Sequence, residues 1–224
     1  MVSVICPVYN EEKILFENFA AFQKLSSRSE LIFVDGGSID ESRKIANRFG
    51  RVLESKKGRA VQMNSGAISA NNEILLFLHA DTTVSKDALA AIEAGIIENG
   101  YAGGCLTQRI DKKGLIFRLI ELQGNIRARL TKEFYGDQGI FVKKSVFLKI
   151  GGFPEVPIME DVLFTRRLRD FGKTVVLPDK IFVSARRWES RGIIKTFLLY
   201  NWIILLFRFG YPLNKLKRLY DDLR

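Results

Sequence analysis

The stretch Leu75-Leu76-Phe77-Leu78-His79-Ala80-Asp81-Thr82-Thr83 decides the fold, because an apolar run stops abruptly at polar residues. A short apolar run bounded in this way is typical of a buried strand that ends at a loop. Alternation along a strand would turn His79 and Asp81 toward the same side. A carboxylate there suits a hard cation that bridges phosphate oxygens, whereas a turn-capping Asp81 beside a half-buried His79 is the competing interpretation.

Strand and helix signals alternate around this stretch. In the first half, strand patterns lie at residues 2–6, 31–34, 52–54 and 73–78. Helical patterns lie between and after them, at residues 11–24, 38–49, 58–70 and 86–98. Repeated strand–helix pairs predict a parallel sheet with right-handed crossovers. Ligands of such sheets lie beyond the carboxyl ends of the strands, where Tyr9, Asp35 and Asp81 fall. The second half is less regular, with strand patterns at 103–110, 138–142 and 181–185 and helical patterns at 115–130 and 162–170.

The composition limits the class of partner. Among 224 residues, 35 Lys and Arg against 25 Asp and Glu give a net charge of +10, which predicts an acidic partner such as a nucleotide, a phosphorylated substrate or an anionic membrane. No nucleic-acid-binding motif is present, so nucleic acid is not expected as a partner. Cys6 and Cys105 lack metal spacing and are expected to be reduced core residues. No signal-peptide pattern follows Met1, so a cytoplasmic location is expected, including the inner face of the cell membrane.

Residues 196–207 form a long apolar run near the C-terminus. As a helix it would cover about 18 Å, which is short of the roughly 30 Å needed to cross a bilayer. Tyr200, Trp202 and Tyr211, together with flanking basic residues, favour an interfacial helix. A buried helix or an oligomer contact is the alternative.

Several common motifs are absent: no GxGxxG follows an early strand, and there is no GxxxxGK[ST], HExxH, CxxC or GxSxG. The chemistry-bearing strings that remain are Pro7-Val8-Tyr9-Asn10-Glu11, Val34-Asp35-Gly36-Gly37-Ser38-Ile39-Asp40, Lys57-Gly58-Arg59, His79-Ala80-Asp81, Gly136-Asp137-Gln138-Gly139, Glu160-Asp161 and Arg186-Arg187-Trp188. In this order they resemble the family-2 glycosyltransferases of the GT-A fold, most closely the small bacterial branch described as radical-SAM/selenodomain-associated transferases.

The resemblance implies an α/β GT-A fold with a mainly parallel central sheet flanked by helices. It covers residues 1–190, which are expected to be the transferase domain. The apolar run and its flanking basic residues predict an amphipathic or apolar helical tail at 191–224, which could touch a membrane surface or another subunit. It also implies an inverting, metal-dependent enzyme that moves a sugar from a UDP- or GDP-linked donor to a glycan or lipid acceptor.

Donor-binding residues follow from the same resemblance. Pro7, Tyr9 and Glu11 match the first nucleotide-contacting loop, and Asp35 matches the acceptor of a hydrogen bond from the base or ribose. The segment near the base and phosphates is matched by Gly58, which permits close backbone approach, and Arg59, which offers a planar fork to oxygen atoms. The competing interpretations are a strand terminator for Pro7, a first-turn helix charge for Glu11 and a surface position for Arg59.

The string His79-Ala80-Asp81 occupies the place of the family's DxD motif, with His79 in place of the first Asp. The resemblance makes Asp81 the main ligand of a Mn²⁺ or Mg²⁺ ion held by the sugar-nucleotide diphosphate. One carboxylate with phosphates and waters is adequate for Mg²⁺. His79 would favour Mn²⁺ if it coordinates, or would instead hydrogen-bond the donor sugar or a core carbonyl.

The catalytic residues implied by the resemblance are Glu160, Asp161 and Arg187. Asp161 matches the general base that takes the acceptor's proton, whereas helix N-terminal charge pairing with the following arginines is the alternative for the Glu160-Asp161 pair. Arg187 would neutralise the leaving diphosphate. The acceptor side is matched by Asp137, Gln138 and Trp188, and Ser184 replaces the Gln of the processive relatives' motif, which argues against processive polymerisation.

Two other functions remain open on the sequence. A nucleotidyltransferase would use a similar sheet, but such enzymes carry a glycine-rich basic loop where this chain has residues 7–12. A non-catalytic basic module on a membrane is favoured by the charge and the apolar run of the C-terminal part.

Overall fold

The structure is a computed structural model that describes residues 1–221, and the side chain of Arg187 lies outside the described part. Within it the strands form one eight-stranded sheet in the order β3-β2-β1-β4-β7-β6-β8-β5. The strands are β1 (Val2–Val8), β2 (Glu30–Asp35), β3 (Arg51–Glu54), β4 (Ile74–Phe77), β5 (Thr82–Val84), β6 (Gly103–Ile110), β7 (Phe141–Lys143) and β8 (Thr174–Val183).

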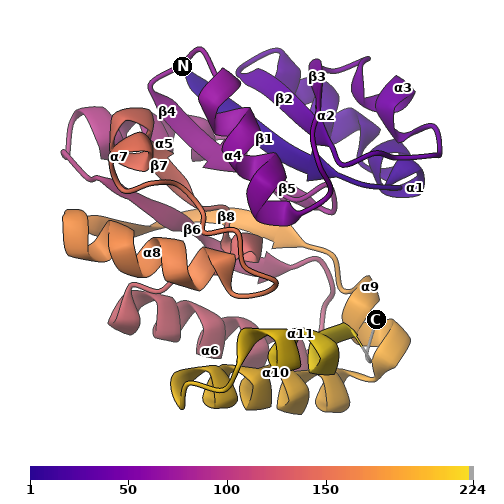
Figure 1. The fold of residues 1–224 in the computed structure, drawn as a ribbon, viewed down its shortest axis with the longest axis vertical. Coiled ribbons are helices and arrows are strands. Elements are labelled where there is room, and N and C mark those ends of the chain that lie inside the picture. The colour runs from indigo at the N-terminus through magenta and orange to yellow at the C-terminus, as the bar shows by residue number, and fades with distance from the viewer. Residues whose placement is uncertain (222–224) are drawn as a thin grey trace.

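Helices cover both faces of this sheet (Figure 1). They are α1 (Glu12–Glu17), α2 (Phe19–Ser26), α3 (Ser42–Ala46), α4 (Arg59–Ser69), α5 (Ala88–Ile97), α6 (Leu115–Thr131), α7 (Lys144–Lys149), α8 (Glu160–Phe171), α9 (Arg186–Arg191), α10 (Ile193–Arg208) and α11 (Leu213–Asp221), with a short 3-10 turn η1 (Gly136–Gln138). The predicted helix at 11–24 is two helices, because the chain turns at Asn18, whose Nδ2 donates to the carbonyl of Ala80 at 2.8 Å.

The sheet is mixed, which refines the expectation of a mainly parallel one. β1 pairs in parallel with β2 and β4, and β2 with β3. β7 runs antiparallel between β4 and β6, because the chain enters β7 directly from η1 and must travel back from the carboxyl edge of β4. β6 and β8 are parallel, and β5 lies antiparallel to β8 at the far edge.

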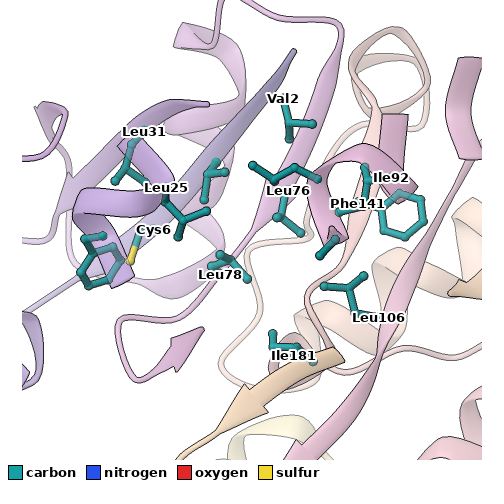
Figure 2. Packing of buried hydrophobic residues seen from close by; sticks show 14 of the residues in the cluster. Val2, Cys6, Leu25, Leu31, Leu76, Leu78, Ile92, Leu106, Phe141 and Ile181 are labelled. Atoms are coloured by element: carbon teal, nitrogen blue, oxygen red, sulfur yellow. The ribbon is translucent and has the colours of Figure 1, made fainter. Parts of the chain in front are cut away.

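The core consists of two apolar layers, one on each face of the sheet. Val2, Val4, Cys6 and Val8 of β1 face the layer that α2 and α5 complete, whereas Ile5 faces the layer of α4, α7 and α8. Figure 2 shows the first layer, in which residues from β1, α2, β2, β4, α5, β6, β7 and β8 converge. The alternation seen in β1 is the period-two pattern of a strand buried on both sides. Both cysteines are buried and unpaired, as expected.

The C-terminal helices pack back onto the domain instead of leaving it. Ile203 of α10 and Leu216 of α11 are buried against Met159 and Val162 at the start of α8. Figure 1 shows α10 and α11 along the lower edge of the molecule, far from the N-terminus. Among the described residues, no helix combines the length and the apolar character that a bilayer crossing requires.

Candidate active site

A cleft of about 770 Å³ opens beyond the carboxyl ends of β1 and β4. It brings together the predicted site residues Pro7, Tyr9, Glu11, Gly58, Arg59, His79, Asp81, Asp137, Glu160, Asp161 and Trp188. Asp35 and Gln138 are not among its lining residues, and the side chain of Arg187 lies outside the described residues, so its predicted role stays a prediction. Residues separated by more than 150 positions therefore share one cavity at the edge where α/β sheets bind ligands.

Two hydrogen bonds fix the loop that follows β1. The backbone N–H of Asn10 donates to Ser38 Oγ at 2.9 Å, and that of Glu11 donates to Ser42 Oγ at 2.7 Å. Asn10 has φ 53°, a left-handed conformation that Asn tolerates better than most residues. The loop is thereby held against the segment after β2, with Tyr9 facing the cleft.

Asp35 is not among the residues that line the cleft, and its predicted contact with the nucleotide stays a prediction. Its side chain is 1% exposed, and its carboxylate accepts the N–H groups of Gly37 at 3.0 Å and Ser38 at 3.0 Å. The carboxylate thus orders the turn after β2, because an Asp side chain commonly bonds to backbone N–H groups two or three residues on.

Gln62 is a site residue that sequence reasoning missed. Its buried Nε2 donates to the carbonyl of Val8 at 2.8 Å and to that of Val34 at 2.7 Å, and it lines the cleft. It therefore links the carboxyl ends of β1 and β2, alongside the hydrogen bond that the N–H of Gly36 donates to the Val8 carbonyl at 3.0 Å. A polar residue in a helix rich in small residues gives no periodic signal, so the sequence offered no pointer to this role.

The segment before α4 supplies positive charge to one wall. Lys57, which was not predicted as a site residue, places its Nζ 3.7 Å from the ring centroid of Tyr9. Gly58 has φ 151°, a conformation that favours glycine, and the chain then enters α4 at Arg59. Arg59 Nη1 lies 3.2 Å from Glu160 Oε1 and so links this wall to α8. Cationic side chains at this position favour an anionic ligand.

His79 and Asp81 lie beyond β4, in a turn, so strand alternation is the wrong reason for expecting them together. The N–H and Oγ1 of Thr82 both donate to the carbonyl of His79, at 3.1 and 2.8 Å. This turn puts both side chains on the cleft wall. A Cβ on Gly136 would lie 2.7 Å from His79 Nε2, so the imidazole packs directly against η1.

The residues present fit a cation only in part. Among the described residues, no group of three or more His, Cys, Asp and Glu side chains could hold a metal ion. A cage made of protein alone is therefore not available there. One carboxylate, Asp81, with the phosphates and waters of a bound ligand still satisfies the preference of Mg²⁺ for few protein ligands.

Asp161 is held firmly in the first turn of α8. Met159 precedes that turn with φ 66°, which is uncommon for a residue with a side chain. Asp161 Oδ2 accepts the N–H of Gly136 at 2.7 Å, and Oδ1 accepts the N–H of Val162 at 2.7 Å. Burial, followed by the negative charge of Glu160, raises the pKa of Asp161 to about 7, although Gly136 and Arg59 act in the opposite direction.

That pKa gives Asp161 an acid–base character unlike that of an ordinary surface carboxylate. A general base works best with a pKa close to the working pH. His79 lies on the same side of Gly136 as Asp161, because Asp161 Oδ2 and His79 Nε2 are both within 4 Å of the position that a Cβ on that glycine would take. Glu160 is buried and paired with Arg59. The arrangement can accept a proton from a hydroxyl group bound in the cleft.

The two site residues predicted in the loop at η1, Asp137 and Gln138, have different surroundings in the structure. Asp137 lines the cleft and accepts a hydrogen bond from Gln108 Nε2 at 2.6 Å. Gln138 is 0% exposed, so the prediction that it lines the acceptor side is wrong. Its Oε1 accepts the N–H of Tyr135 at 3.1 Å and an N–H of Arg127 at 3.2 Å, which makes it a support for the loop.

The wall opposite the β1 loop is aromatic and includes residues that the sequence did not reveal. Trp188 of α9 meets Tyr200 of α10 edge to face at 5.4 Å between ring centroids, and Tyr200 stacks with Tyr220 of α11 at 6.1 Å. Ile203, Ile204 and Lys217 also line the cleft. The run at 196–207 is apolar on nearly every side, so its periodicity did not indicate which residues face a ligand.

The fold and the cleft together define a class of α/β proteins. Their sheet has a parallel half, here β3-β2-β1-β4, and a cleft with acidic side chains at the carboxyl edge of that half. The family model described as "Glycosyl transferase family 2" matches residues 3–151, more than half of the chain. The chain therefore belongs to glycosyl transferase family 2. The match ends before Glu160 and Trp188 and does not distinguish the predicted radical-SAM-associated branch, which stays a prediction.

Curated glycosyltransferases are similar to the chain, among them one from Bacillus subtilis and one from Haloferax volcanii. The "Probable glycosyltransferase YdaM" of Bacillus subtilis is 24% identical over 216 residues, which is 84% of this chain and 50% of that protein. "Glycosyltransferase AglE" of Haloferax volcanii is 27% identical over 196 residues, which is 76% of this chain and 62% of that protein. The chain thus spans between half and two thirds of the length of these relatives.

Solved structures share the GT-A fold. The mannosyltransferase PcManGT from Pyrobaculum calidifontis, in complex with GDP-Man and Mn²⁺, matches with a TM-score of 0.66 at 20% identity over 81% of this chain and 56% of its own. Residues 1–349 of TarS from S. aureus, in complex with UDP-GlcNAc, match with a TM-score of 0.63 at 20% identity over 82% of this chain and 58% of their own. At this identity the likeness establishes the fold.

Proposed function

We propose that this protein transfers a sugar from a nucleotide-diphosphate donor to an acceptor hydroxyl, with inversion at the anomeric carbon. The observation that carries the proposal is Asp161, a carboxylate with its pKa raised to about 7 in the cleft that Asp81 also lines. Family membership and the UDP-GlcNAc and GDP-Man bound by two neighbours in fold support a UDP- or GDP-linked donor.

The donor would lie along the wall made by the β1 loop and the segment before α4. Lys57 and Arg59 provide positive charge for the diphosphate, and Tyr9 provides a ring for the base or ribose. Asp81, with His79 beside it, would hold a Mn²⁺ or Mg²⁺ ion through the phosphates. Such an ion would supply Lewis-acid stabilisation of the departing nucleoside diphosphate.

The reaction would need a single displacement. The acceptor oxygen forms a bond to the anomeric carbon while the bond from that carbon to the phosphate oxygen breaks, and Asp161 takes the hydroxyl proton. The nucleoside diphosphate leaves with the bonding electrons. No covalent enzyme intermediate is required, and one displacement inverts the anomeric configuration.

The acceptor would enter from the aromatic wall. Trp188, Tyr200 and Tyr220 offer ring faces, and Ile203 and Ile204 add apolar surface to the same part of the cleft. Rings and apolar side chains favour a sugar ring or a lipid chain over a highly charged molecule. A glycan or a lipid-linked acceptor is therefore the acceptor class that we propose.

The test is substitution of Asp161 by Asn, with turnover measured as nucleoside-diphosphate release from UDP- and GDP-sugars in the presence of Mn²⁺. Loss of a general base should lower kcat by about 10²- to 10⁴-fold while donor binding persists. The matched control is Asp170→Asn at the exposed end of the same helix, which should keep full turnover. Unchanged turnover in Asp161→Asn would rule out Asp161 as the general base. Release of pyrophosphate in place of nucleoside diphosphate would indicate a nucleotidyltransferase.

A further inference from the structure

Two helices expose apolar stripes on the side of the molecule away from the sheet. On α6 the exposed residues Leu115, Leu119, Leu122, Ile126 and Leu130 recur every three or four positions. On α10 the exposed residues Ile194, Leu198, Trp202 and Leu205 do the same. Spacing of three and four places side chains on one helix face. We call these two stripes together the α6–α10 face.

The two stripes form one continuous surface. Gln123 Nε2 of α6 donates to Asn201 Oδ1 of α10 at 2.6 Å. Gln123 lies one turn from Leu119 and Ile126, and Asn201 lies one turn from Leu198 and Leu205, so the stripes flank the hydrogen bond on each helix. Beneath this bond, buried residues of α6 pack against partly buried residues of α10. Figure 1 shows both helices at the lower edge of the molecule.

The charges around the α6–α10 face are complementary to an anionic surface. α10 contains no acidic residue, and the single acid of α6, Glu121, is buried and paired with Arg109 and Arg118. The exposed cations Arg129, Lys195 and Arg208 lie within one turn of exposed apolar residues. Large apolar patches on soluble proteins mark interaction sites, and basic residues around such a patch favour anionic lipid headgroups.

The geometry points to a bilayer surface as the occupant: we propose that the α6–α10 face binds in the plane of an anionic membrane. α10 has 16 residues, a length of about 24 Å, which suits a helix lying in the interface better than one crossing it. Trp202, 53% exposed, is a residue type that prefers the interface.

This orientation has a consequence for the cleft. The other side of α10 carries Tyr200, Ile203 and Ile204, which line the cleft. One helix therefore separates the cleft from the bound membrane, so its aromatic wall would lie beside the lipid headgroups. A membrane-borne acceptor follows from this position; that part rests on the proposed function, whereas membrane binding itself does not.

Co-flotation with vesicles tests the proposal on the full chain. Vesicles of phosphatidylglycerol and phosphatidylcholine should carry the wild type to the top of a gradient, and vesicles of phosphatidylcholine alone, or high salt, should carry much less. The double variant Leu198→Glu with Trp202→Glu should lose at least about tenfold in partitioning, and Lys195→Ala roughly fivefold. Absence of wild-type flotation would overturn the proposal.

The control variants are Ile39→Glu and Ile97→Glu, which change exposed apolar residues, 92% and 70% exposed, away from the face. They should float like the wild type. Sedimentation of the same proteins separates the competing occupant: a wild-type dimer that does not float, and that the double variant dissociates, would assign the face to a second copy and overturn the proposal. Nucleotide binding in the double variant should be unchanged, so failure here is distinct from failure of the proposed function.

Discussion

Two charged neighbours, Glu160 and Arg59, act in opposite directions on the pKa of Asp161. Burial and Glu160 raise the pKa of Asp161, whereas Arg59 and the N–H of Gly136 lower it. Because Glu160 and Arg59 are themselves paired at 3.2 Å, a single substitution changes the balance in a known direction. The pH dependence of turnover is therefore the most informative property at the scale of single residues.

In the proposed mechanism the ionised form of Asp161 is the active base, so kcat/KM should rise with pH and level off above about 7. Glu160→Gln removes a negative charge and should move this acid limb to lower pH, while Arg59→Ala removes a positive charge and should move it to higher pH. The measurement is the pH profile of kcat/KM for each variant. Shifts in the same direction for both variants would contradict the assignment of the limb to Asp161.

Asp81 should account for the metal-dependent part of nucleotide binding. UDP or GDP with Mn²⁺ should raise the apparent Tm of the wild type, since a ligand of the folded state stabilises it by mass action. Asp81→Ala should keep only the shift seen without the metal. The control is Asp87→Ala, an exposed aspartate at the start of α5. An undiminished Mn²⁺ effect in Asp81→Ala would exclude that residue from the metal site.

At the scale of elements, Gln62 of α4 joins the ends of β1 and β2 under the nucleotide wall. Gln62→Met should lower the free energy of unfolding by about 1–3 kcal/mol, because the carbonyl groups of Val8 and Val34 each lose one buried hydrogen bond. Urea denaturation measures the change, and Gln23→Met on the exposed side of α2 should be nearly neutral. Equal stability of the two variants would mean that Gln62 is not a structural link.

Individual elements differ in how far the sequence predicted them. The strand at 73–78 was predictable because a buried parallel strand leaves an unbroken apolar run, and the structure has β4 at Ile74–Phe77. β5 and the first half of β8 were missed, since Thr82–Val84 is a short edge strand and Thr174–Val183, which lies between β6 and β5, contains charged residues and a proline. Local pattern does not identify edge strands that are only partly buried.

The candidate site was predictable where a motif is local. The Glu160-Asp161 pair and the His79-Ala80-Asp81 turn came from short strings, and both line the cleft. Asp35 and Gln138 do not line the cleft, because backbone N–H groups and Arg127 take up their oxygen atoms, a competition that the sequence does not show. Positions such as Gln62 and Tyr200 depend on packing between distant elements, which no local pattern reports.

At the scale of the whole molecule, the C-terminal helices have two functions in this account. One side of α10 completes the cleft and the other belongs to the α6–α10 face, so the segment predicted as a tail at 191–224 joins the site to a surface. The buried Ile203 agrees with the expectation of a buried helix on one side of α10, and the expectation of an interfacial helix on its other side stays a prediction.

The central claim is transfer of a sugar by a single displacement, and the anomeric configuration of the first-formed product tests it most directly. With an α-linked UDP- or GDP-sugar, Mn²⁺ and water or a glycan as acceptor, proton NMR followed from the start of the reaction should show nucleoside diphosphate and a β-configured product. An α-configured first product, or pyrophosphate in place of nucleoside diphosphate, would contradict the account.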